Sequence, residues 1–141
     1  MEQESIERLL DRKNVIAVVG VSRSPEKYGH QVYRYLKSAG YKVYPINPKA
    51  AEILGDRCYL DLKALPEKPD LVCFVVPPKV TEEILRTCME IGIRRVWMQP
   101  GAESEKAIEL CHSNGIEVIY GTCIMLQHKA LEERKGLATG E

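Results

Sequence analysis

The chain has 141 residues, of which 45% are hydrophobic and 28% charged, and its twenty Lys and Arg residues balance twenty Asp and Glu residues. This length allows one domain with a core of its own. The lack of a basic excess argues against a protein that binds nucleic acid through its phosphates, so we expect no nucleic-acid partner. No apolar run approaches the roughly 18 residues of a membrane span, so we expect no membrane partner either.

The predicted strands are five short apolar runs that recur along the chain. A short amphipathic helix is predicted first, over residues 5–12. The runs then begin 21 to 28 residues apart, at 15–20, 42–46, 70–76, 95–98 and 116–120. Such spacing is too long for hairpins and is typical of a strand, a crossover helix and a parallel return strand.

The segments between these runs predict helices. An apolar stripe at i, i+4 and i+7 occurs between the first two runs and again at Ile84, Cys88 and Ile91. Three of these helices end at a glycine just before the next strand, namely Gly40, Gly92 and Gly115. The pattern predicts an α/β fold with one domain over 1–141, a doubly wound, Rossmann-like sheet of five parallel strands.

The end of the chain predicts a final helix. It is expected to run from Cys123 to about Lys135, with a frayed tail at 136–141. His128 follows Cys123 by five residues, which is about 500° around a helix, so the two side chains share no face unless the helix starts after Cys123. A structural cysteine is therefore favoured over a catalytic Cys–His pair.

Ligands of an open parallel sheet bind outside the carboxyl ends of its strands, so the loops there form the candidate site. In the first loop, Gly20 permits a tight turn and Gly29 lies near the start of the next helix, which predicts backbone N–H groups facing a phosphate. Ser22 stands where the dinucleotide fingerprint has its second glycine, so the match to that motif is poor. A turn without a ligand is the alternative.

The second loop argues against NAD. A dinucleotide-binding domain places an acidic residue there for the ribose hydroxyls, whereas this chain has Asn47, Pro48 and Lys49. A cation suits a phosphorylated ribose, as in NADP or coenzyme A, and Arg23 and Lys27 add positive charge. Solvated surface cations are the ordinary alternative.

The remaining loops are rich in Gly, Pro and small polar residues. In the third, Val76, Pro77 and Pro78 predict a rigid corner that could also serve as an apolar wall. The five cysteines are odd in number, scattered and without a C-x-x-C pair, so no metal site is predicted. They are typical of reduced thiols, and we expect a cytoplasmic protein.

Together the loops resemble the stand-alone CoA-binding proteins, a family similar to the nucleotide-binding domain of the succinyl-CoA synthetase α subunit and of NDP-forming acyl-CoA synthetases. The resemblance runs from about Ile6 to His128 and rests on 18–29, 40–48, 76–78, 96–101, and Cys123 with His128. It implies a Rossmann-like domain that binds coenzyme A or an acyl-CoA. The three histidines match no phosphorylatable histidine of the synthetases, so ligase activity is not expected.

The resemblance also implies the binding residues. The phosphates are expected at the first loop, whose site residues are Gly20, Ser22, Arg23, Lys27, Tyr28 and Gly29. The adenosine 3′-phosphate region is expected at Asn47, Pro48 and Lys49. The path of the nucleotide or pantetheine is expected along Val76, Pro77 and Pro78, with Gln99, Pro100 and Gly101 on its far side. Cys123 is expected beside the pantetheine end, as a structural cysteine or as a redox partner of the CoA thiol.

The leading hypothesis is a binding protein for coenzyme A or acyl-CoA that is not catalytic by itself. The sequence does not identify a protein partner. An NADP-dependent oxidoreductase shares the expected fold and basic loop, but the sequence contains no evident catalytic set for it. A nucleotide-sensing interaction protein is the third possibility.

Overall fold

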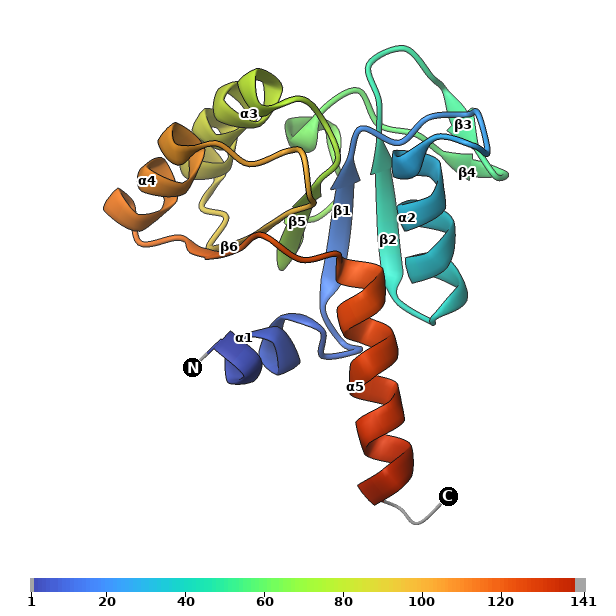
Figure 1. Cartoon of the computed structure of the whole chain (residues 1–141). Coiled ribbons are helices and arrows are strands. Elements are labelled where there is room, and N and C mark those ends of the chain that lie inside the picture. The colour runs from blue at the N-terminus through green and yellow to red at the C-terminus, as the bar shows by residue number, and fades with distance from the viewer. Residues whose placement is uncertain (1, 139–141) are drawn as a thin grey trace.

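Five parallel strands form the central sheet, in the order β2-β1-β5-β6-β7 (Figure 1). In this computed structural model, which describes residues 2–138, the strands are β1 (Val15–Val19), β2 (Lys42–Ile46), β5 (Leu71–Phe74), β6 (Arg95–Met98) and β7 (Glu117–Ile119). Each lies within one of the five apolar runs. The predicted five-stranded parallel sheet is therefore confirmed.

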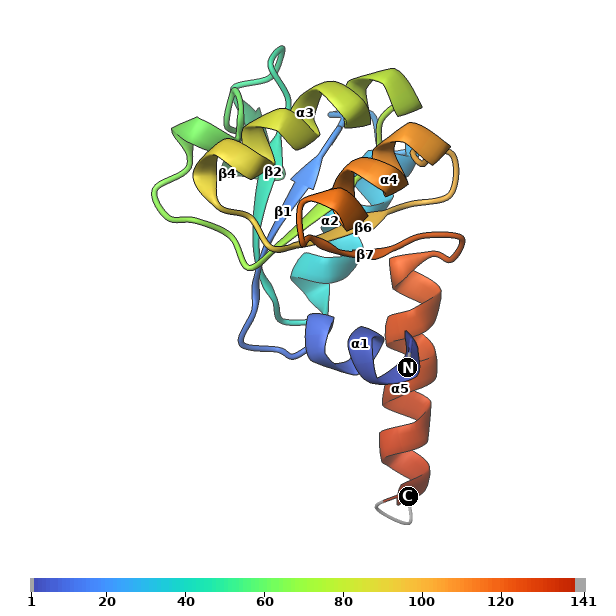
Figure 2. The same ribbon diagram turned by 90° about the vertical axis from the view of Figure 1, so that its left-hand side faces the viewer.

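Helices cover both faces of this sheet (Figure 2). One face is covered by α1 (Glu2–Leu9), α2 (Tyr28–Ser38) and α5 (Ile124–Ala138), and the other by the 3₁₀ helix η1 (Leu62–Ala64), α3 (Pro78–Ile91) and α4 (Glu105–Ser113). Along β1, Ile16 and Val18 belong to the first core, whereas Ala17 and Val19 belong to the second. Because β1 is buried on both faces, its sequence is apolar without alternation.

The first and last helices differ from their predicted bounds. Helix α1 begins at Glu2 and ends at Leu9, and it buries Ile6 and Leu9 against the sheet. Helix α5 continues past Lys135 to Ala138, and it extends beyond the body of the domain (Figure 1). The rest of the tail expected to fray, 139–141, lies outside the described residues. Within residues 2–138, no helix has both the length and the apolar character to cross a membrane.

A small antiparallel hairpin, β3 (Glu52–Ile53) and β4 (Asp56–Arg57), was not expected from the sequence. Its strands are too short to show an alternating pattern. After the hairpin the chain runs alongside β2, where the Asn47 amide donates to the Tyr59 carbonyl at 3.0 Å. This contact brings the segment Leu60–Leu62 to the carboxyl end of the sheet.

The predicted glycine stop is confirmed at the end of α3. Gly92 adopts φ +79°, and its amide bonds the carbonyl oxygens of the last turn. Because only glycine enters this left-handed region without strain, the helix ends here and β6 begins three residues later. Positive φ values also occur at Gly40 and Gly115.

Candidate functional site

The first turn of α2 lies directly against the end of β1, where the order of the strands reverses. Gly20 has φ +97°, and a Cβ on it would lie 2.2 Å from the Val75 carbonyl oxygen. A Cβ on Gly29 would lie 2.0 Å from the Gly20 carbonyl oxygen. Both approaches require glycine, because every other residue carries a Cβ. The loop 21–28 is therefore closed at its base by a glycine–glycine crossing.

Two helix N-termini border this crossing without a side-chain cap. Lys27 precedes α2 and Pro77 precedes α3, and neither side chain bonds the first turn of its helix. Helix α4 differs, because Ser104 Oγ accepts a hydrogen bond from the Ala107 amide at 3.0 Å. An uncapped N-terminus offers backbone donors and the positive end of the helix dipole to an anion. The arrangement suits a phosphate group.

A pocket of about 380 Å³ lies beside the crossing, between the ends of β1 and β2 and helix α3. Most of its wall is aliphatic, while two carboxylates, one side-chain amide and one hydroxyl supply the polar side chains. A cavity of this size and composition is typical of a small-molecule site. Its walls are formed by Val19, Gly20, Ile46, Asn47, Pro48, Leu60, Asp61, Leu62, Val76, Val80, Glu83, Ile84 and Thr87.

Four of the predicted binding residues therefore share one cavity: Gly20, Asn47, Pro48 and Val76. The contributions of 60–62 and of α3 to the pocket were not predicted from the sequence. The α3 residues had a usable signal, since Val80, Ile84 and Thr87 follow the same i, i+4, i+7 spacing as a helix face. The segment 60–62 had none, because its place depends on the hairpin before it.

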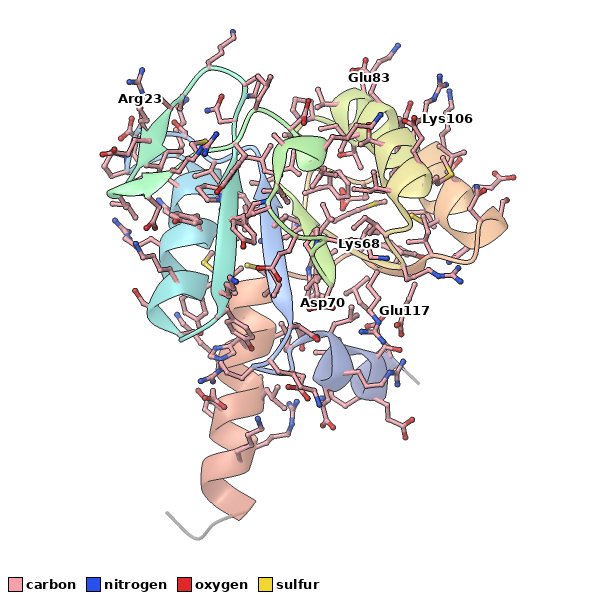
Figure 3. All side chains as sticks on the ribbon, turned by 180° about the vertical axis from the view of Figure 1, so that it is seen from behind. Arg23, Lys68, Asp70, Glu83, Lys106 and Glu117 are labelled. Atoms are coloured by element: carbon pink, nitrogen blue, oxygen red, sulfur yellow. The ribbon has the colours of Figure 1, made fainter. Side chains whose placement is uncertain are left out.

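Three predicted phosphate-binding cations lie outside the walls of the pocket. Arg23, Lys27 and Lys49 are exposed, and none of them forms an ion pair with another described residue. Arg23 lies at the hairpin side of the rim, across the molecule from Lys106 on α4 (Figure 3). Their role in binding a phosphate stays a prediction, but their charges are free to meet an anionic ligand.

Asn47 joins the loops that form the pocket. Its Nδ2 donates to the Val21 carbonyl at 2.7 Å, and its Oδ1 accepts from the Lys49 amide at 2.8 Å. The side chain thus ties the loop after β2 to the loop after β1. Besides lining the pocket, Asn47 holds the two loops together.

A second cluster joins three other predicted site residues, from the loops after β1, β6 and β7. Tyr28 Oη donates to Cys123 Sγ at 3.1 Å, and Gln99 Nε2 lies 2.6 Å from Tyr28 Oη and 3.3 Å from Cys123 Sγ. Gln99 Oε1 accepts from the Ile124 amide at 2.7 Å. Burial alone would raise the pKa of Cys123, but these donors and the amides at the start of α5 outweigh it and lower the pKa below its ordinary value.

The other predicted residues hold the loops or lie outside both groups. Ser22 Oγ accepts from the Ser24 amide at 3.0 Å. Pro78 is the first residue of α3, a position that suits proline. Pro100 and Gly101 are exposed in the turn after β6 and contribute to neither the pocket nor the cluster. Within 2–138, no group of three or more His, Cys, Asp or Glu side chains is placed to hold a metal ion.

His128 is bonded elsewhere and does not pair with Cys123. Its Nδ1 lies 2.7 Å from Tyr35 Oη, and its ring packs edge-on against Tyr35 and Tyr41. Helix α5 begins at Ile124, directly after the cysteine. Because the helix starts after Cys123, the expectation of about 500° of helical rotation between the two residues does not apply, and His128 is held by its bond to Tyr35 instead.

Acidification below about pH 6.5 is expected to destabilise the fold through His128. Burial is the main cause that lowers its pKa from 6.5, with Arg12 and Lys135 acting in the same direction and Glu132 against it. The unfolded chain then binds its proton at a higher pH than the folded chain, so stability falls as pH drops below the unfolded pKa. As the pH is lowered from 7.5 to 5.5, the urea midpoint of unfolding should fall less for His128→Gln than for the wild type. An equal fall in the two proteins would contradict this.

The sequence model of the CoA-binding domain family matches residues 14–129. The α subunit of an ADP-forming acetate–CoA ligase II of Pyrococcus furiosus is 34% identical over 120 residues, which are 77% of this chain and 26% of the subunit. An uncharacterized protein of Bacillus subtilis, YneT, is 33% identical over 127 residues, 87% of this chain and 91% of that protein.

A solved structure shows the same architecture. That of a hypothetical protein from Pyrococcus horikoshii OT3 has a TM-score of 0.87 and 34% sequence identity, and the match covers 93% of this chain and 92% of that one. The chain therefore spans about a quarter of the ligase subunit. It spans most of both smaller proteins.

Proposed function

The chain belongs to the family of CoA-binding domains, and we propose that it binds coenzyme A or an acyl-CoA across the carboxyl ends of its strands. In this proposal the domain is a binding protein and catalyses no ligase reaction by itself. The observation that carries it is the apolar pocket of about 380 Å³ beside two uncapped helix N-termini, at the reversal of strand order.

The parts of coenzyme A fit the parts of this rim. The adenine ring suits the aliphatic pocket, and the pyrophosphate suits the uncapped first turn of α2 at the glycine crossing. The unpaired Lys49 and Arg23 suit the 3′-phosphate, because the pocket itself contains carboxylates and no cation. The pantetheine arm then leads along the rim toward Gln99 and Cys123.

The alternatives gain less support. Neither the matched family nor the three relatives point to NADP, and two of the three carry no activity in their names. All five cysteines are free, which supports the reducing environment expected for a cytoplasmic protein.

Calorimetric titration with CoA, dephospho-CoA and NADPH tests the proposal. We expect CoA to bind most tightly, and dephospho-CoA to bind about tenfold more weakly because it lacks the phosphate assigned to the cations. In Lys49→Ala, CoA affinity should fall toward that of dephospho-CoA, while dephospho-CoA affinity should not change.

Lys106→Ala is the matched control, since Lys106 lies on the opposite flank of the rim (Figure 3). It should bind CoA as wild type does. If CoA does not bind, the proposed function is wrong; if CoA and dephospho-CoA bind equally, the role given to Lys49 is wrong.

A further inference from the structure

Hydrogen-bond donors from three segments converge on the sulfur of Cys123. They are Tyr28 Oη, Gln99 Nε2 and the backbone amides of Met125 and Leu126. A neutral thiol is a weak acceptor, whereas a thiolate is a strong one. A sulfur that receives several donors is therefore stabilised in its nucleophilic form.

Gln99 is built to hold this arrangement. It is fully buried, and its Oε1 is engaged by the Ile124 amide at 2.7 Å. The amide group can therefore present only its NH₂ to the sulfur and to Tyr28. A buried side chain with no freedom to turn makes the donor a permanent part of the cluster.

The other four cysteines have the opposite surroundings. Burial raises the pKa of Cys58, Cys73, Cys88 and Cys111. Of the five, Cys123 alone has a lowered pKa. The chemical difference follows from its donors, because burial acts on all five sulfurs in the same direction.

The cluster lies close to the surface, and apolar residues near Cys123 in the chain are exposed as well. Cys123 is 9% exposed, and Tyr28, which bonds it, is 37% exposed. Two more of the large hydrophobic residues left exposed, Tyr120 and Leu126, are three residues from Cys123 on either side. Such residues could pack against the methyl and methylene groups of an arm that also carries amides and ends in a thiol.

The cluster and the nucleotide pocket belong to the same rim. Tyr28 adjoins Gly29, Gly29 meets Gly20, and Gly20 lines the pocket. Coenzyme A is a long molecule with its adenine at one end and its thiol at the other. When the adenine ring of CoA fills the pocket, its thiol end can therefore extend past the Gly20–Gly29 contact toward Cys123.

We propose that Cys123 exchanges with CoA disulfide and holds one CoA as a mixed disulfide, an inference that rests on the proposed function. The Cys123 thiol first loses its proton to solvent. Its thiolate then attacks one sulfur of CoA disulfide, whose S–S bond breaks as the bond between Cys123 and that sulfur forms. The second CoA leaves as a thiolate and takes a proton from water. CoA disulfide is the oxidant, so no other redox partner is needed.

Mass spectrometry of the intact protein after incubation with CoA disulfide tests the proposal. We expect one CoA moiety per chain, removed by dithiothreitol and absent in Cys123→Ser. Cys58→Ser is the matched control, because Cys58 is 6% exposed but has a raised pKa, and it should still form the adduct. An adduct that persists in Cys123→Ser, or none in wild type, would overturn the proposal.

Two rate measurements separate a built site from a merely accessible thiol. Tyr28→Phe removes one donor and should slow adduct formation at pH 7 about five- to tenfold. At equal concentration, CoA disulfide should react at least about tenfold faster than 2-hydroxyethyl disulfide, because binding places its sulfur beside Cys123. Equal rates for the two disulfides would show that the site does not direct the reaction.

Binding of reduced CoA to the wild type, measured by calorimetry in dithiothreitol, distinguishes the two proposals. If the wild type binds CoA but forms no adduct with CoA disulfide, the exchange is wrong and the proposed function stands. If the wild type does not bind CoA and both disulfides react equally, the two proposals fail together. Cys123→Ser should melt near the wild-type temperature, which shows that the loss of its adduct is not a loss of the fold.

Discussion

Gly29→Ala is expected to lower the free energy of unfolding by about 3 kcal/mol or more and to abolish CoA binding. The new Cβ would lie 2.0 Å from the Gly20 carbonyl oxygen. The atoms that the new methyl group would meet are backbone atoms of Gly20 and Val21, so no side chain can turn aside to make room. Helix α2 must therefore move away from β1. This displacement would open the crossing on which the phosphate is expected to rest.

The matched control is Gly136→Ala. Gly136 is also helical, but a Cβ there meets nothing within 4 Å. Alanine is the better helix former, so this variant should gain about 0.5–1 kcal/mol. Urea unfolding of both variants measures the difference, and a Gly29→Ala protein with the wild-type midpoint would contradict the geometry of the crossing.

Asn47→Asp is expected to reduce CoA affinity about 10- to 100-fold. The substitution keeps the shape and the acceptor for the Lys49 amide, but it removes the donor to the Val21 carbonyl, 2.7 Å away. Two acceptors then face each other, and a negative charge is added in the wall of a site expected to hold phosphates. Calorimetry with CoA measures the loss.

Asn114→Asp is its control. Asn114 Nδ2 donates to the Leu110 carbonyl at 2.8 Å, so the same substitution breaks the same kind of bond at the end of α4. It should change stability slightly and leave CoA affinity unaltered. If both variants bind CoA as the wild type does, Asn47 has no part in the site.

The loops after the strands were predictable as the candidate site, but their division into two groups was not. A glycine after β1 and a Pro-rich corner after β5 are local signals, and the structure places Gly20 and Val76 in one pocket. The approach of Tyr28 and Gln99 to Cys123 joins residues 95 and 24 positions apart. No local pattern marks such a contact.

The hairpin β3–β4 shows the same limit. Two-residue strands leave no periodicity, and the hairpin moves Leu60 and Asp61 into the wall of the pocket. The stripe predicted for α3 runs through Ile84, Cys88 and Ile91, whereas its pocket face includes Val80, Ile84 and Thr87. Spacing alone does not say which neighbour a helix face meets.

Strand and helix order, parallel pairing and the burial of the sheet on both faces follow from residue spacing, since apolar periodicity is a property of neighbours along the chain. The hydrogen-bond donors around Cys123 and the unpaired charges of Arg23 and Lys49 follow from folding. A hydrogen bond or an unpaired charge is defined by distances of a few ångströms between segments, and those distances exist only once the helices pack against the sheet.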